Sequence, residues 1–100
     1  MTSAKDVVML ILDDIDTDIR ILKASHEFAE SKMNNAKYKK RSAMDSGMGY
    51  MIASEEFDSS IGYYTGIADE CKSRIKELQT RRDIYLSLYK QYAEEGEENE

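Results

Sequence analysis

The chain has no proline and no tryptophan, and only one cysteine among its 100 residues. Because proline is the usual helix breaker, its absence leaves long uninterrupted helices open to the whole sequence. The single cysteine, Cys71, cannot form a disulfide within the chain, and its neighbours Ile67, Ile75 and Leu78 predict a buried thiol in a reducing compartment. The cytoplasm is therefore the expected location.

Long apolar runs and excess positive charge are also lacking. The longest apolar run, VVMLIL at 7–12, is far shorter than the roughly 20 residues of a membrane span, and no signal-peptide pattern precedes it. The 20 acidic and 14 basic side chains give a formal net charge of −6. This balance disfavours generic binding to DNA or to anionic membranes. We expect no membrane association and no generic DNA binding.

The apolar residues of the first half follow the heptad spacing of a helix. Segment 13–22, DDIDTDIRIL, alternates like a β-strand, but the alternation lasts only about eight residues and no turn signal flanks it. Ser3, with Asp6 three positions later, is a plausible N-terminal cap. Steps of three and four instead connect one set of positions, which we call seam 1: Val8, Leu12, Ile15, Ile19, Leu22, His26, Ala29, Met33 and Ala36.

The second half carries a longer heptad repeat. It comprises Tyr50, Phe57, Tyr64, Cys71, Leu78, Tyr85 and Tyr92, together with Ile61, Ala68, Ile75, Arg82 and Tyr89, and we call it seam 2. Turn-forming residues between the halves are concentrated in the segment MDSGMG at 44–49. The sequence thus predicts an all-α protein, a long antiparallel helical hairpin resembling a coiled coil.

The predicted boundaries are a first helix at 4–43, a turn at 44–50 and a second helix at 51–93, forming one domain over 1–93. Gly62 and Gly66 each cost about 1 kcal/mol in a helix interior, so a break near 58–66 is the alternative to a continuous or kinked second helix. The glycines could instead let another backbone approach closely. The acidic segment 94–100 opposes the helix dipole and is expected to form a disordered tail.

The aspartates at 13–18 suggest either a calcium loop or a structural role. A calcium loop starting at Asp14 requires glycine at its sixth position and glutamate at its twelfth, but Ile19 and Ser25 occupy them. If the chain reverses near residue 47, residue numbers that add up to about 94 face each other, which places Arg82 beside 12–16. We therefore expect the aspartates to accept its charge, and an acidic surface that mimics nucleic acid is the alternative.

No catalytic motif occurs: the sequence lacks a nucleophile elbow, a P-loop, a zinc pattern and a Cys/His pair. His26, the only histidine, lies in seam 1 near Glu27 and Glu30. Helical metal sites draw repeated Glu-x-x-His units from several helices, and none is present. We expect no enzyme, no cofactor and no metal site, with His26 packed between the helices.

One basic cluster stands out in this acidic chain. Lysines in a last helical turn usually complement the helix dipole and stay solvated. Alternatively, they meet the turn amides and hold a phosphate or an acidic segment. The residues of this candidate anion site are Lys37, Lys39, Lys40, Arg41, Gly47 and Gly49, with Lys32 nearby.

A second apolar stripe on the first helix lies well over 100° from seam 1, and a two-helix hairpin leaves it in water. We call it the outer stripe: Val7, Leu10, Ile21, Ala24 and Phe28. Ile84 on the second helix is similarly uncovered, and Met44, Met48, Tyr50 and Met51 form an apolar patch at the turn. These residues are the candidate interface, and a second copy of the chain, giving a dimer, is the simplest cover.

The sequence therefore favours a non-enzymatic oligomer that acts by stoichiometric binding to an unidentified protein, as an adaptor or inhibitor. Small acidic proteins without catalytic motifs are common in phages and mobile elements, so we expect that origin. Two other functions stay open. One is sequestration of a small phosphorylated ligand, such as a nucleotide, at the basic turn, and the other is an acidic decoy for a nucleic-acid-binding protein.

Overall fold

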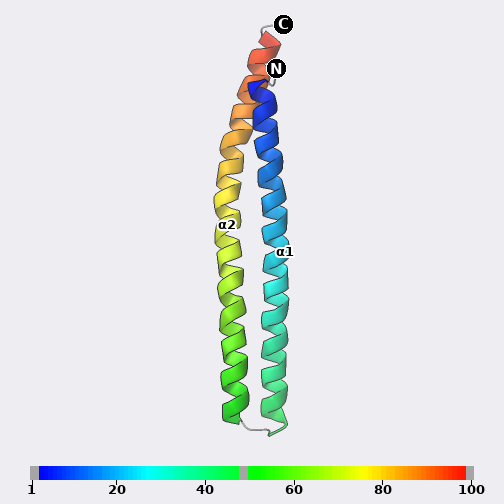
Figure 1. Cartoon of the computed structure of the whole chain (residues 1–100), viewed down its shortest axis with the longest axis vertical. Helices are drawn as coiled ribbons and strands as arrows, with labels where there is room; N and C mark the ends of the chain where they lie inside the picture. Colours follow the sequence, from blue (N-terminus) through cyan, green and yellow to red (C-terminus); the bar gives the residue numbers. More distant parts are fainter. Residues whose placement is uncertain (1–2, 48–49, 99–100) are drawn as a thin grey trace. The chain divides into compact units, whose positions relative to one another are not determined.

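The computed structural model describes residues 3–47 and 50–98, without the side chains of 50–54 and 96–98. Two helices account for nearly all of this part of the chain: α1, Ala4–Asp45, and α2, Tyr50–Glu98. They run in opposite directions (Figure 1), and the described residues that follow α1, Ser46 and Gly47, form a turn. The predicted all-α helical hairpin is confirmed, and the strand interpretation of 13–22 is excluded because that segment is helical throughout.

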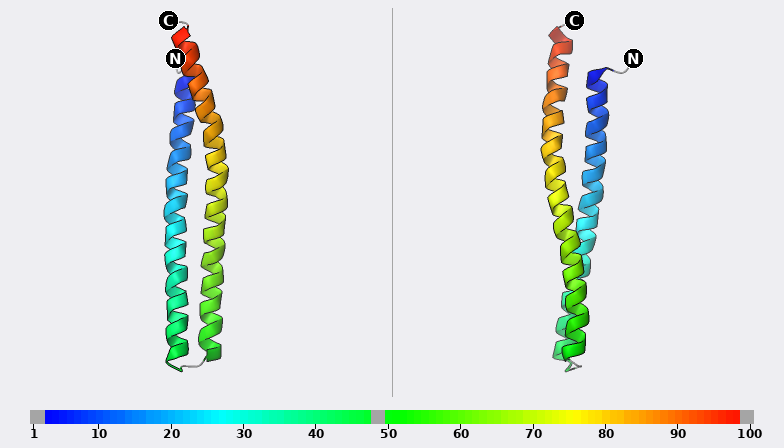
Figure 2. Two further views of the ribbon diagram at one scale, coloured as in Figure 1. Left: turned by 180° about the vertical axis from the view of Figure 1, so that it is seen from behind. Right: turned by 60° about the vertical axis from the view of Figure 1, so that its left-hand side comes forward.

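The chain divides into two compact units. Unit 1 contains Met1–Leu22 and Arg74–Glu100, and unit 2 contains Lys23–Ser73. Each unit is an antiparallel pair formed by one segment of α1 and one segment of α2 (Figure 2). The division does not interrupt either helix.

The buried residues of both units come from the predicted seams. In unit 1 they are Val8, Leu12, Ile15 and Ile19, and in unit 2 they are Ala29, Ala36, Ala68 and Cys71. Unit 1 packs branched aliphatic side chains of α1 against half-buried tyrosines of α2, whereas unit 2 is built largely on alanine. Ala29 is 0% exposed, the most complete burial among the core residues described. The heptad prediction is therefore confirmed at these positions.

Polar contacts fix the register within each unit. In unit 1, Arg82 Nε donates to Asp16 Oδ1 at 2.6 Å, as the sequence predicted. In unit 2, Lys40 Nζ donates to Asp58 Oδ1 at 2.6 Å, and Thr65 Oγ1 lies 3.1 Å from Met33 Sδ.

The residue numbers in all three contacts add up to 98, slightly above the predicted 94. Because α1 ends at Asp45 and α2 begins at Tyr50, residues at the same backbone level have numbers that add up to about 95. Helical side chains lean toward the N-terminus of their own helix by about one residue or slightly more, which accounts for the difference.

Local signals set the ends of α1. At its start, the backbone N–H of Asp6 donates to Ser3 Oγ at 3.1 Å, so Ser3 caps the helix as predicted. At its end, Gly47 has a φ of 73°, a left-handed conformation that favours glycine and terminates helices. Ser46 Oγ also donates to the Ala43 carbonyl at 3.0 Å. Met48 and Gly49 lie outside the described residues.

The helix α2 continues through Gly62 and Gly66, so the break considered near 58–66 does not form. A Cβ added at either glycine would meet no atom within 4 Å, so neither permits a close backbone contact within the described chain. Seam residues on both sides of the glycines pack against α1, which offsets their low helix propensity. The helix also extends to Glu98, past the predicted end at 93, since glutamate favours helix and the dipole penalty is small.

Candidate protein-binding surface

The described residues contain no group of three or more side chains suited to hold a metal ion. His26 is half-buried in unit 2, and its Nε2 lies 3.5 Å from Glu30 Oε1 on the next helical turn. A search of the described helices for a segment long and apolar enough to cross a membrane found none.

The aspartates at 13–18 have two different environments. Asp16 is half-buried and bound to Arg82, which gives it a structural role in unit 1. Asp13, Asp14 and Asp18 are exposed. One aspartate of the cluster, Asp16, therefore helps to set the register of the two helices, and the other three form an exposed acidic surface.

The basic cluster does not converge on one point. Lys40 is bound to Asp58, so an anion would have to compete with that carboxylate. Lys37 and Arg41 are exposed. Lys39 lines a groove of about 280 Å³ in unit 2, together with Lys32 and one acidic residue. The acid is Glu56, and the other lining residues are Asn35, Ala36, Phe57, Ser60 and Tyr64. Gly47 terminates α1, and Gly49 is not described.

The sequence could have identified the Lys40 contact. Continuing seam 1 by four residues from Ala36 reaches Lys40, which is half-buried as a seam position should be. The sequence pattern was instead interpreted as solvated lysines or as an anion site.

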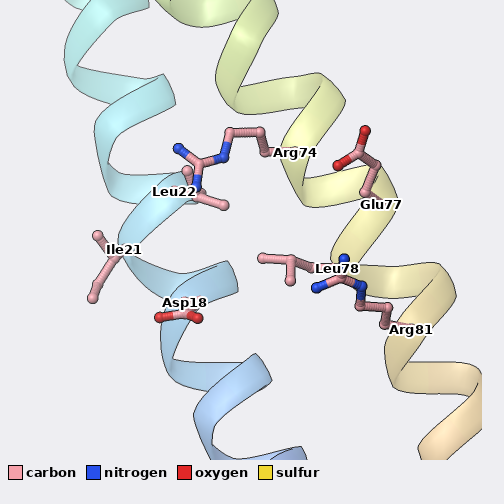
Figure 3. A pocket seen from close by; sticks show the side chains of 7 residues that line it. All are labelled: Asp18, Ile21, Leu22, Arg74, Glu77, Leu78 and Arg81. Carbon is pink, nitrogen blue, oxygen red and sulfur yellow. The ribbon is translucent and has the colours of Figure 1, made fainter.

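A larger groove of about 470 Å³ lies in unit 1 (Figure 3). Arg74, Leu78 and Arg81 reach from α2 toward α1, whereas Ile21 points away from α2. Asp18, Leu22 and Glu77 complete the lining. The lining contains two acidic side chains, two arginines and two leucines. Because both signs of charge are present, the groove does not define a binding site for an ion of one sign.

The outer stripe is uncovered in unit 1. Leu10 is 61% exposed and Ile21 is 58% exposed, and Val7 is exposed as well. By contrast, two seam residues close to them in the sequence are buried: Val8, which follows Val7, and Ile19, which precedes Ile21 by two positions. The segment of α1 in this unit therefore has two apolar faces, and α2 covers only one of them.

The same pattern holds in unit 2. Phe28 is 59% exposed, and the Nζ of Lys32 on the next helical turn lies 5.5 Å from its ring centroid. Tyr38 is exposed further along α1, and the sequence prediction missed it. Large aromatic side chains in water are a common mark of a surface that binds another protein.

The remaining candidate interface residues are dispersed. Ile84 in unit 1 and Met44 in unit 2 are exposed as predicted, and Tyr63 on α2 is an exposed residue that the prediction missed. Met48 lies outside the described residues, and the side chains of Tyr50 and Met51 are not described. The apolar patch at the turn is therefore only partly described, whereas the outer stripe supplies four of the nine exposed large apolar side chains among the described residues.

Comparison of the chain with protein families, curated proteins and solved structures found no match.

Proposed function

We propose that the protein acts by stoichiometric binding to another protein, as an adaptor or inhibitor, and that the outer stripe of α1 is its binding face. One observation carries this proposal. Leu10, Ile21 and Phe28 are each more than half exposed, although each lies on a helix whose seam face carries the buried residues that pack against α2.

Covering these side chains supplies a driving force for binding. Removing apolar surface from water contributes about 25 cal/mol per Å², and a leucine or phenylalanine that becomes fully buried contributes roughly 1.5–3 kcal/mol. Three such residues on one helix resemble the anchors by which a helix docks into a partner's groove. No catalytic step is required for a protein of this kind.

The test compares three versions of the tagged protein in pull-downs from a native lysate, followed by mass spectrometry. They are the unmodified protein, Phe28→Glu on the outer stripe, and Gln79→Glu on the exposed surface of α2. Both substitutions add one negative charge. A glutamate four residues before Lys32 also forms a favourable helical pair, so Phe28→Glu should preserve the helix.

The proposal predicts a protein captured by the unmodified chain and by Gln79→Glu but lost from Phe28→Glu. Capture that is equal for all three versions would show that the stripe is not the binding face. Recovery of nucleotides or nucleic acid in place of a protein would favour the basic turn or the acidic decoy.

A further inference from the structure

The outer stripe is part of a second heptad repeat. Steps of three and four from Val7 lead through Leu10, Ile21, Ala24 and Phe28 to Tyr38, with polar residues at the intervening positions. The polar positions are Asp14, Thr17, Ser31 and Asn35. A repeat with this spacing stays on one face of an uninterrupted helix such as α1 when the helix supercoils to 3.5 residues per turn. A heptad face of this kind fits another helix.

The charges of α1 indicate which helix fits. Residues 6–18 carry five aspartates and no basic side chain, whereas residues 32–41 carry five basic side chains and no acidic one. Asp16 and Lys40 are engaged with α2, which leaves four charges of each sign. A partner helix must therefore offer basic groups to one end and acidic groups to the other. The helix α1 of a second copy does so when it lies antiparallel.

We propose that a second copy of the chain covers the outer stripe, with the two α1 helices antiparallel and their two-fold axis between Leu22 and Lys23. This inference rests on the proposed role of the stripe as a protein-binding face, so the second copy and any other protein partner compete for it. Facing residues then have numbers that add up to about 45. Ile21 packs on the partner's Ala24, Thr17 on the partner's Phe28, and Val7 on the partner's Tyr38.

The positions beside the stripe support this register. Arg20 lies against the partner's Glu27, and Asp6 lies against the partner's Arg41, so each pair has opposite charges. The symmetry of the dimer repeats each pair. A shift of one heptad would place Glu27 against the partner's Glu27. A parallel arrangement would bring the aspartates of the two copies together, and both alternatives are therefore disfavoured.

The charge pairs permit a test in which two weakened variants rescue each other. In Arg20→Glu alone, both symmetric pairs become acid against acid, and in Glu27→Arg alone both become base against base. In a mixture of the two variants, both pairs join opposite charges again. Arg20 and Glu27 are exposed and form no side-chain hydrogen bond or ion pair within the described part of the chain, so neither change should disturb the hairpin.

Sedimentation equilibrium measures the dissociation constant of each dimer at low salt. We expect it to rise about tenfold for each variant alone and to return to within about threefold of the unmodified value in the 1:1 mixture. Lys76→Glu, which makes a similar charge change on the exposed surface of α2, is the matched control and should leave the constant unchanged.

Three results would overturn the proposal. The unmodified protein could be monomeric at hundreds of micromolar, both variants could dimerise as tightly as the unmodified chain, or the mixture could be no tighter than its components. If the unmodified protein is monomeric, the pull-down still tests the proposed function independently. A protein that the unmodified chain captures and Phe28→Glu does not would show that the stripe binds a partner other than a second copy.

Discussion

The ion pair between Asp16 and Arg82 should contribute measurably to the stability of unit 1. Two unit charges at 2.6 Å attract each other by about 1.6 kcal/mol in water and by about 6 kcal/mol at an effective dielectric constant of 20. The two side chains are 41% and 38% exposed, so solvent screening and the loss of side-chain entropy reduce this attraction strongly. We expect a net coupling of about 0.5–1 kcal/mol.

Single substitutions cannot isolate this coupling. Asp16→Ala removes the pair but gains about 0.5 kcal/mol of helix propensity, and Arg82→Ala also removes the packing of the arginine stem. A double-mutant cycle with both alanine variants cancels these contributions. Circular dichroism at 222 nm monitors urea unfolding of the four proteins. All four are compared at one protein concentration, because dimerisation makes apparent stability depend on concentration.

The coupling free energy between Asp16 and Arg82 also depends on the salt concentration. A coupling of about 0.7 kcal/mol corresponds to roughly 3–6 °C in melting temperature for a domain of this size, and it should shrink in 1 M sodium chloride. A coupling within error of zero at low salt would refute the reasoning, and Arg82 would then occupy its seam position through its stem alone.

Three further experiments test the packing of the hairpin. Gly62→Ala and Gly66→Ala should each raise the free energy of unfolding by about 1 kcal/mol, since an added Cβ meets open space, and destabilisation would reveal a contact on that face. Ala29→Leu should lower it by about 1–3 kcal/mol in denaturant titrations, whereas Ser73→Leu on the exposed surface should change it by less than about 0.5 kcal/mol. Cys71 is buried, so a thiol reagent should modify it only as fast as the protein opens, and rapid labelling without denaturant would contradict its position.

The sequence predicted the fold because one periodic signal runs through both halves. Two heptad repeats, no proline and one glycine-containing turn leave a helical hairpin as the consistent solution. The same repeats identified the buried residues and placed Arg82 beside the aspartates, as observed at Asp16. The effect of the glycines was harder to judge, because helix propensity is local whereas the packing of neighbouring seam residues is tertiary.

The candidate site was only partly predictable. The period of α1 showed that Leu10, Ile21 and Phe28 lie away from seam 1, and the structure finds all three exposed. The Lys40–Asp58 contact was missed because seam 1 was ended at Ala36, one step before Lys40, so Lys40 was interpreted from its local charge alone.

A single tryptophan would report directly whether the outer stripe is covered in solution. The chain has no tryptophan, so Phe28→Trp supplies the only indole, and its emission shifts to shorter wavelength when the ring leaves water. Tyr63→Trp is the matched control, because Tyr63 is an exposed aromatic residue on α2 outside the proposed interface. The measurement is the emission maximum of each variant as the protein is diluted from hundreds of micromolar. We predict that Phe28→Trp changes from a buried to a solvated spectrum on dilution, while Tyr63→Trp is solvated throughout. A solvated spectrum for Phe28→Trp at every concentration would contradict the assignment of the outer stripe to a second copy of the chain.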